Sequence, residues 1–249
     1  MNTKTIFKSI LIIAFVGIII TIAILLVSKN TNIPTATANI LQMENQNEQE
    51  KKIFDTISSE ASYKADPTEP SNLLDSSNRY IIKVKVLDVG EAEFLPKTDL
   101  YNNPYTPSTP IKVEIIDTLY GENVQPKDNI IYISGGNIKI SNYEKNIDET
   151  DIARLGINEL TEGEKESQYL RFTNKYFYNV EIGQEYVVIV GKIGNDTYKI
   201  VDEGCGIFIP ENNDIADRSA VSNKLVSSVS EKTFTENELI NIANEKSNK

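Results

Sequence analysis

The chain opens with an uninterrupted apolar segment. Residues 10–27 read ILIIAFVGIIITIAILLV and contain no charged side chain. As an α-helix this segment covers about 27 Å, close to the hydrocarbon thickness of a bilayer. Lys4 and Lys8 precede it and only Lys29 follows closely, so the positive-inside rule places the N-terminus in the cytoplasm. We expect residues 1–30 to be a signal anchor, with a single transmembrane helix at 10–27 and the rest of the chain extracellular.

A cleaved secretory signal is the alternative to an anchor. Ala36-Thr37-Ala38 resembles a signal-peptidase site, and Pro34 would end the helix before it. The apolar run is longer than a usual signal core, and the site lies well downstream of Val27, which favours retention. No cysteine follows the run closely, which excludes lipoprotein processing under either interpretation.

The next segment, 31–71, is polar. It is rich in Asn, Gln, Glu, Thr and Ser and contains the breaker cluster Asp66-Pro67-Thr68-Glu69-Pro70, a composition typical of a stalk. The spacing of its few apolar residues permits a short amphipathic helix over 47–60, and the alternative is a disordered spacer.

Beyond the stalk, apolar and polar positions alternate in the way that predicts β-strands. Residues 80–86 place Tyr80, Ile82, Val84 and Val86 on one face and Ile81, Lys83 and Lys85 on the other, and residues 111–115 alternate in the same way between apolar and charged positions. This is the period of a half-buried strand. The four prolines of the segment 96–110 exclude the centre of a sheet and indicate a loop. Further strands are predicted at 130–134, 186–190, 198–201 and 206–209, and the 186–190 run is apolar enough to be covered on both faces.

Glycine-rich turns and a polar insertion separate these strands. Gly135-Gly136-Asn137 supplies positive φ angles for a tight reversal into a short return strand at 138–140, and Gly194-Asn195-Asp196 predicts a hairpin turn. Residues 142–175 are polar and acid-rich, so we expect an insertion with one or two helical turns.

The C-terminal part, 211–249, reads as a polar linker followed by a helix. Thr235 and Glu238 have capping-box spacing, and Phe234 and Leu239 occupy the positions of a hydrophobic staple. Leu239 also begins an apolar stripe that continues at Ile242 and Ala243. Such a stripe predicts a helix packed on its own domain.

Four stretches together resemble small OB-like β-barrel domains of uncharacterised extracytoplasmic proteins from Gram-positive bacteria. They are IIKVKVLDVG at 81–90, IKVEIIDTLYG at 111–121, IYISGG at 131–136 and YFYNVEIGQEYVVIV at 176–190. The similarity covers roughly residues 72–210. It implies a mainly β fold, a small OB-like antiparallel β-barrel at 72–210 with the insertion 142–175, and an extracytoplasmic location. It implies no reaction and no catalytic residue.

The amino-acid composition disfavours some classes of binding partner and excludes some classes of reaction. Three of the 25 basic residues lie in 1–30, which leaves 22 against 36 acidic residues and a formal charge of −14 for the remainder. Nucleic acid and anionic lipid are disfavoured as partners because both require basic surface. The chain has no histidine, which excludes Ser-His-Asp and Cys-His hydrolases and His-ligated zinc.

The single cysteine, Cys205, is the first candidate for chemistry. Asp202 and Glu203 are its nearest charged neighbours in the sequence, and both disfavour a thiolate. We interpret Cys205 as a packed thiol that makes no intrachain disulfide and no thiolate cluster.

Acidic and oxygen-rich stretches are the remaining candidates, as paired carboxylates of a hydrolase or as calcium ligands. The calcium hypothesis lacks support because the glycine and the terminal glutamate of an EF-hand loop are missing. The hydrolase hypothesis lacks support because the acids lie in polar segments, where carboxylates are ordinarily solvated. Gly135-Gly136 also lacks the lysine and helix of a phosphate-binding loop. We therefore predict no catalytic, cofactor-binding or metal-binding residue, and no cofactor. The acids and amides considered are Glu162, Glu164, Glu166, Asp88, Glu91, Glu93, Asp148, Glu149, Asp151, Asn212, Asn213, Asp214 and Asp217.

Aromatic residues gather in the loops, where OB folds usually take ligands. A binding surface at one mouth of the barrel is one interpretation, and packing in the core or under the loops is the favoured one. The residues concerned are Tyr101, Tyr105, Tyr169, Phe172, Tyr176, Phe177 and Tyr178.

The sequence as a whole predicts a membrane-anchored, extracytoplasmic, non-catalytic module that binds a protein or a cell-wall component. The competing hypotheses are a carboxylate-dependent hydrolase of wall glycan and a cleaved, secreted protein.

Overall fold

The computed structural model describes residues 51–60, 63–101, 106–122, 124–211 and 224–247, all of which belong to one compact unit. The predicted anchor, the stalk before residue 51, Tyr105 and the oxygen-rich stretch Asn212 to Asp217 lie outside the described residues. In the described part, no helix has the length and apolarity to cross a bilayer.

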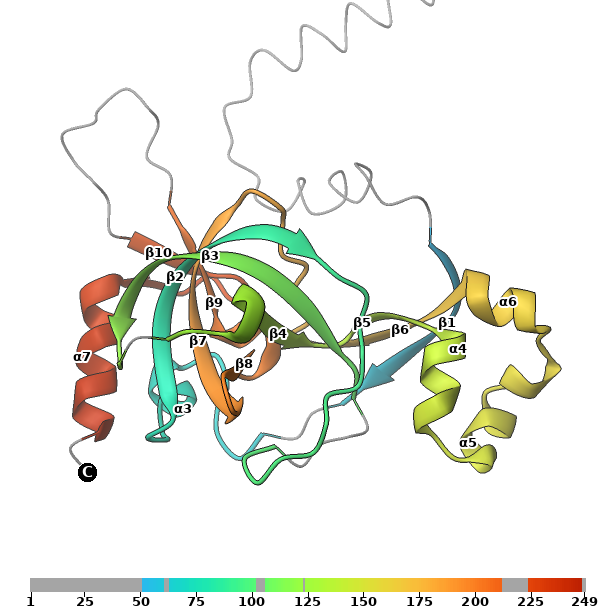
Figure 1. The fold of residues 1–249 in the computed structure, drawn as a ribbon. Helices are drawn as coiled ribbons and strands as arrows, with labels where there is room; N and C mark the ends of the chain where they lie inside the picture. Colours follow the sequence, from blue (N-terminus) through green and yellow to red (C-terminus); the bar gives the residue numbers. More distant parts are fainter. Residues whose placement is uncertain (1–50, 61–62, 102–105, 123, 212–223, 248–249) are drawn as a thin grey trace, which may run out of the picture. The chain divides into compact units, whose positions relative to one another are not determined.

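Five strands close into a β-barrel (Figure 1). Going round the barrel, the order is β2-β3-β4-β8-β7 and back to β2, and only the β4–β8 pair is parallel. The predicted mainly β fold and the closed barrel are therefore confirmed. The strands are β2 (Arg79–Val89), β3 (Ser108–Tyr120), β4 (Ile130–Ser134), β7 (Glu185–Gly194) and β8 (Thr197–Ile200).

Alternation along these strands fills the barrel. The inward positions of β2 are Ile82, Val84 and Val86, none more than 1% exposed, and those of the other strands join them in one core. Because side chains point to opposite faces at successive positions, the same strands direct their lysines outward. The β2 alternation read from the sequence thus separates the barrel core from the outer face, where Lys83 and Lys85 lie and where Ile81 is buried in a second core.

The strand β7 is buried on both faces, as its continuous apolar run predicted. Val188 and Val190 point into the barrel, whereas Val187 and Ile189 belong to a second core on the outside. Two helices, α3 (Pro70–Leu73) and α7 (Glu236–Ser247), contribute residues to this second core.

The C-terminal residues extend the barrel sheet and then form the predicted helix. β9 (Ile207–Pro210), β10 (Lys224–Ser227) and β11 (Thr233–Thr235) add antiparallel strands beyond β7. β10 lies in the segment expected to be a polar linker, so that expectation is wrong at 224–227. The helix itself is confirmed: Thr235 and Glu238 form a capping box, and Leu239 and Ala243 are buried on the same unit.

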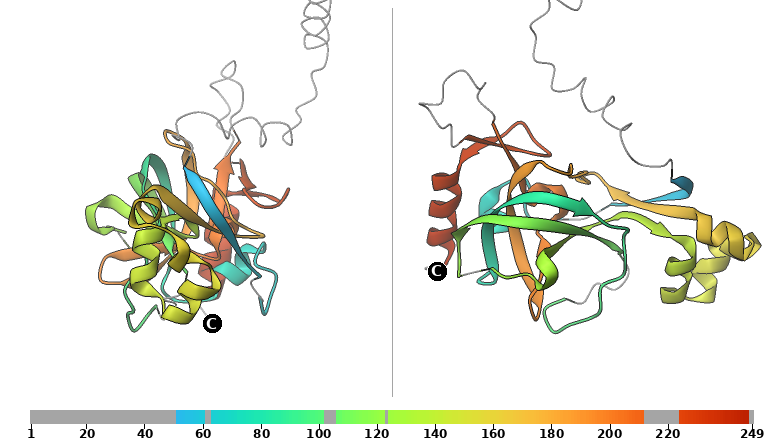
Figure 2. Two further views of the ribbon diagram at one scale, coloured as in Figure 1. Left: turned by 90° about the vertical axis from the view of Figure 1, so that its right-hand side faces the viewer. Right: turned by 45° about the horizontal axis from the view of Figure 1, so that its top comes forward.

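The chain leaves the barrel after β4 and builds a lobe with its own core before it returns at β7 (Figure 1). In two views this lobe and α7 lie on different sides of the barrel (Figure 1 and Figure 2). The lobe core comprises Ala92, Ile138, Ile140, Tyr143, Ile157, Leu170 and Phe172. Its elements are β5 (Gly136–Lys139), α4 (Ile140–Tyr143), η3 (Glu144–Asn146), α5 (Glu149–Arg154), η4 (Ile157–Glu159), α6 (Glu162–Ser167) and β6 (Gln168–Asn174).

A three-stranded sheet of order β1-β6-β5 supports the lobe and corrects two expectations. Residues 52–59 form the strand β1 (Lys52–Ser59), parallel to β6, instead of an amphipathic helix. Phe54 and Ile57 pack against the lobe core from this strand, so tertiary pairing outweighs the local helical spacing. Gly135 and Gly136 do have positive φ angles, 87° and 109°, but they turn the chain from one sheet into the other, since β5 pairs with β6 and not with β4.

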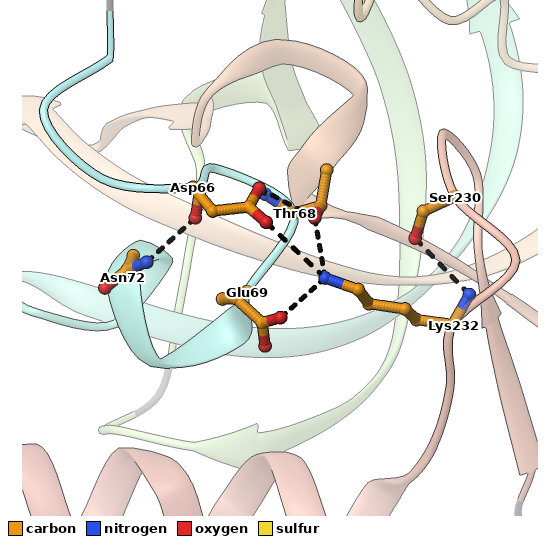
Figure 3. Close-up of polar contacts among 6 residues, drawn as sticks. All are labelled: Asp66, Thr68, Glu69, Asn72, Ser230 and Lys232. Atoms are coloured by element: carbon orange, nitrogen blue, oxygen red, sulfur yellow. Dashed lines mark hydrogen bonds and ion pairs between the residues drawn. The ribbon is translucent and has the colours of Figure 1, made fainter.

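The segment from Tyr63 to Asn72, called the strap below, connects β1 to the region before β2. At its centre, Lys232 Nζ lies 2.9 Å from Thr68 Oγ1, 2.5 Å from Glu69 Oε1 and 3.6 Å from Asp66 Oδ2 (Figure 3). Asn72 Nδ2 donates a hydrogen bond of 2.8 Å to the Asp66 carbonyl oxygen (Figure 3). The strap is thereby fastened to the β10–β11 turn.

Candidate functional site

Among the described residues, four large apolar side chains are exposed: Leu87, Leu100, Ile116 and Ile182. Leu100 lies in the β2–β3 loop. The other three, exposed by 44%, 45% and 65% respectively, come from β2, β3 and the turn before β7. Single exposed apolar residues need no explanation, but three on neighbouring segments form a candidate docking surface.

Two of these residues sit at β-bulges. Val86 pairs with Val113 and Asp88 with Lys112, so Leu87 is the extra residue of β2. In the same way Ile116 is the extra residue of β3, between Ile115 and Asp117. A bulge re-aims a side chain, and bulges are frequent beside functional sites.

Both bulge residues point out of the barrel. Their neighbours Val86 and Ile115 pack in the barrel core, whereas Leu87 and Ile116 are exposed and are each followed by an exposed aspartate. Between the two bulges, Lys85 pairs directly with Glu114 on the same outer face. The outer face of β2 and β3 therefore carries an apolar residue on either side of a pair of opposite charges.

Ile182 borders this face at the end of β2. The Gly183 amide donates to the Val86 carbonyl oxygen at 2.8 Å, and the Val86 amide donates to the Gln184 carbonyl oxygen at 3.0 Å. These bonds continue the β2–β7 ladder and place the turn beside Leu87. We call the surface formed by Leu87, Ile116, Ile182, Lys85, Lys112 and Glu114 the bulged face.

A second candidate is a group of polar residues outside the barrel, around Glu203. Tyr63 donates a hydrogen bond of 3.0 Å from its hydroxyl to Glu203 Oε2, and the Asn174 side chain lies near enough to this carboxylate to lower its pKa. Burial raises the pKa of Glu203, and the charge of Asp202 raises it further. We call Tyr63, Asn174, Lys199, Asp202 and Glu203 the Glu203 cluster.

Lys199 brings a partly buried amine to this cluster from the outer face of β8. Its Nζ lies 3.2 Å from the Tyr101 hydroxyl and 4.8 Å from the centre of the same ring. Burial lowers the pKa of Lys199 to about 8, and the charge of Glu203 opposes that change. Lys199 and Glu203 thus influence each other's charge.

The turn that carries the acids has an unusual backbone. Asp202 and Glu203 both adopt positive φ angles, 46° and 61°, in the step from β8 into η5 (Glu203–Gly206). Consecutive residues other than glycine in this region cost free energy and persist only where the surroundings fix them. Here the hydrogen bond from Tyr63 to Glu203 and the burial of Gly204 and Cys205 hold the turn.

Two hollows in the described part of the chain are small. One, of about 150 Å³, is lined by Ile57, Ser59, Thr106, Gly135, Phe172, Thr173 and Asn174. The other, of about 140 Å³, is lined by Lys127, Asp128, Ile130, Tyr132, Asp196 and Thr197. Ligand pockets usually measure about 300 Å³ or more, so neither hollow by itself holds a drug-sized molecule.

Cys205 is buried, as its interpretation as a packed thiol requires. It is 1% exposed and belongs to the second core. Burial, with Asp202 and Glu203 as further causes, raises the pKa of the thiol to about 12. A thiol of this kind is a poor nucleophile at neutral pH.

The acids singled out in the sequence are dispersed. Glu164 accepts hydrogen bonds from Thr161 in the capping box of α6, and Asp148 caps α5. Glu91 accepts a hydrogen bond from Tyr169 and Glu93 accepts one from Tyr132. Within the described ranges, no three His, Cys, Asp or Glu side chains gather as a metal site would need.

The aromatic residues are divided among separate cores. Phe172 packs in the lobe core, Tyr101 packs with Leu95 and Ile193 outside the barrel, and Tyr178 packs against the barrel core. The ring of Tyr176 lies edge-on to that of Tyr63, with 5.5 Å between centroids. For these residues the packing interpretation is confirmed.

Neither the bulged face nor the Glu203 cluster was recognised in the sequence. A signal for the face exists, because Val86-Leu87 and Ile115-Ile116 each place two apolar residues where alternation requires one. The Glu203 cluster has no such signal, since it joins residues from the strap, β6 and the end of β8 that only the fold brings together. Searches of the whole chain against protein-family models and against curated proteins find no match.

Proposed function

We propose that this chain is a membrane-anchored, extracytoplasmic binding module, without catalytic activity, that docks a protein partner on the bulged face. The observation that carries the proposal is the gathering of Leu87, Ile116 and Ile182 at two bulges and one adjoining turn. Apolar side chains around a pair of opposite charges suit a protein surface, which offers both kinds of group.

The location belongs to the same proposal and is supported by the sequence alone. The uncharged run at 10–27 and the lysines before it favour an anchor with its N-terminus in the cytoplasm. We further propose that the barrel is OB-like. Its five strands, with the third and fifth in chain order paired in parallel, support that assignment.

Site-specific photocrosslinking in cells tests the docking surface. A photoreactive amino acid at position 87 or 116 is expected to give one discrete crosslinked product, because both positions would be covered by the partner. The matched control is position 166, an exposed glutamate on α6 in the lobe, which should give none. Equal products at all three positions, or no product at 87 and 116, would contradict the proposal.

Fractionation tests the anchor separately. The full-length chain is expected in the carbonate-washed membrane fraction, with its barrel digested when protease is added to intact cells. Recovery of a soluble product whose N-terminus follows Ala38 would instead establish the cleaved, secreted form.

The rival function is a carboxylate-dependent hydrolase of wall glycan, and one observation favours it. Asp202 and Glu203 are neighbouring acids, and burial raises the pKa of Glu203 towards the range of a general acid. Neither of the two hollows is lined by these residues, which weighs against a substrate cleft there. Wall digestion that is lost in Glu203→Gln and kept in Glu185→Gln would support the hydrolase.

A further inference from the structure

The charges on and beside the bulged face lie in two rows that cross β2 and β3. Lys85 pairs with Glu114 in one row, and Asp88 pairs with Lys112 in the other. Directly paired residues of antiparallel strands share a face of the sheet, so each row presents one lysine and one acid. The lysine belongs to β2 in the first row and to β3 in the second. The sign of the charge therefore alternates along each strand as well as across the pair.

This pattern is complementary to a second copy of itself. A two-fold axis that lies in the contact plane, perpendicular to the strands and midway between the rows, exchanges the two rows. Lys85 of one copy then lies over Asp88 of the other, and Glu114 lies over Lys112. Because the symmetry repeats each contact, every charge of the two rows meets one of opposite sign.

The apolar residues of the face lie close to the same axis. Val86 and Val113 form the pair between the rows and point into the barrel core. Leu87 follows Val86 directly, and the hydrogen bond of 2.8 Å from the Gly183 amide to the Val86 carbonyl oxygen brings Ile182 alongside. Leu87 and Ile182 of both copies would therefore meet at the centre of the contact, inside a rim of charged pairs. An apolar centre with a polar rim is the usual anatomy of a protein interface.

The position of α7 decides between this axis and one that runs along the strands. Lys83 Nζ lies 3.6 Å from Glu236 Oε1 at the start of α7, and Ile81 shares the second core with Leu239. The helix therefore covers the first part of β2 on the same outer face. An axis along the strands would set both copies of α7 over the same end of the sheets and hold the sheets apart. The crosswise axis sets them at opposite ends, so the bulged faces can approach to about 10 Å, the spacing of packed sheets.

The net charge of the protein also favours this face for self-association. The chain has a formal net charge of −11, so two copies repel each other at long range. Each row combines one lysine with one acid and thus carries no net charge. A neutral face of alternating signs adds nothing to that repulsion, whereas a basic partner would be attracted more strongly by an acidic surface.

We propose that the partner of the bulged face is a second copy of this chain, in a symmetric dimer whose two-fold axis crosses β2 and β3 at the Val86–Val113 pair. The inference rests on the proposed function, because it names the occupant of the surface assigned there. The charged contacts between the copies fix the register of the dimer, and the apolar centre supplies most of its affinity.

Sedimentation velocity of the full-length protein in detergent, over a concentration series, tests the charge pattern. The wild type is expected to dimerise reversibly. Lys85→Glu and Asp88→Lys should each weaken the dimer about tenfold or more, because each change brings like charges together at two symmetric positions. An equimolar mixture of the two variants should associate as tightly as the wild type, since the two changes then face each other with opposite signs. Lys145→Glu, at an exposed lysine of η3 in the lobe, is the matched control and should dimerise like the wild type.

A cysteine at the axis tests the geometry. Leu87→Cys is expected to give a disulfide-linked product of twice the chain mass under mild oxidation, because the axis brings position 87 of one copy next to position 87 of the other. Glu166→Cys, at an exposed position of α6 in the lobe, is the control and should give none. The native Cys205 is 1% exposed and therefore stays out of the reaction.

A wild-type chain that stays monomeric, charge variants that dimerise like the wild type, or a mixture that does not associate would overturn the dimer. Photocrosslinking at positions 87 and 116 separates this failure from failure of the proposed function. A product whose mass is not twice that of the chain means that a different protein occupies the face, so the dimer is wrong and the docking surface stands. No product at either position contradicts both. Far-UV circular dichroism and a cooperative melt establish that each variant is folded.

Discussion

Gly136 shows how a single residue fixes the junction between the barrel and the lobe. It has a φ angle of 109°, it is buried, and an added Cβ would overlap Thr109 Oγ1. Thr109 also donates a hydrogen bond of 2.7 Å to the Gly135 carbonyl oxygen, so it is not free to move aside. Both the backbone angle and the space at this corner require glycine.

We predict that Gly136→Ala lowers the free energy of unfolding by more than about 2 kcal/mol, through strain and overpacking. The matched control is Gly163→Ala in α6, where φ is not positive and no atom lies within 4 Å of the added Cβ. That change should stabilise the protein by up to about 1 kcal/mol, since alanine favours a helix. Urea unfolding measures both, and equal effects of the two substitutions would refute the argument.

Lys199 makes a second prediction at this scale. Its pKa is lowered to about 8 by burial, from an ordinary value of 10.5. The folded state thus binds this proton less tightly than the unfolded chain, and Lys199 increases stability as the pH rises from about 8 to 10.5. Subtracting the unfolding free energy of Lys199→Met from that of wild type should reveal this rise.

Lysines and tyrosines as residue types ionise in this pH range, so the control variant must keep the other lysines and the tyrosines of the wild type. Lys112→Met alters an exposed lysine on β3 and leaves Lys199 in place. The rise expected for Lys199→Met is compared with the difference that Lys112→Met shows over the same pH series. A difference for Lys199→Met that stays flat, or that falls with pH, would count against the burial of its amine.

At the scale of elements, local alternation was enough to find the strands whose two faces differ. β2, β3, β4 and the C-terminal helix follow directly from periodicity and capping, because one face of each is mainly apolar and the other carries most of the charged side chains. β6 was hidden in a polar insertion although Leu170 and Phe172 alternate with Arg171 and Thr173. The acidic residues that surround β6 make the whole segment 142–175 polar on average, so the alternation within β6 was not recognised.

Pairing between distant segments is what the sequence did not reveal. β1 has apolar residues at Ile53, Phe54 and Ile57, a spacing that suits a helical turn as well as a bulged strand. Its conformation is decided by β6, more than a hundred positions further along. The bulged face and the Glu203 cluster were missed for the same reason, since a register shift and a contact between strap and barrel exist only in the folded chain.

The described residues of the unit form three large cores, inside the barrel, outside β7 and in the lobe. The lobe core draws on β5, β6 and the helices between them, with Phe54 and Ile57 of β1 against it. The barrel core shares none of these residues. We therefore expect the lobe to open at a lower free energy than the barrel, as a separate cooperative unit.

Ile157→Ala tests this division. Ile157 is fully buried in the lobe core, so its truncation should cost about 2–5 kcal/mol locally. Native-state hydrogen exchange should show lost protection in β1, β5 and β6, with β2 and β7 unchanged. Ile189→Ala, in the second core, is the contrasting variant and should weaken β2 and β7. Equal loss of protection throughout the unit in Ile157→Ala would mean that lobe and barrel unfold together.

The parallel β4–β8 pair has a consequence for how this protein is made. β4 finds one neighbour, β3, as soon as it is synthesised, but its other neighbour follows only after the whole lobe and β7. During elongation on the ribosome β4 is consequently an open sheet edge, which is prone to mispairing with other chains. Since contacts of such long sequence separation slow folding, we expect the pairing of β8 with β4 to be a late step, and a nascent chain stalled before Thr197 cannot complete it.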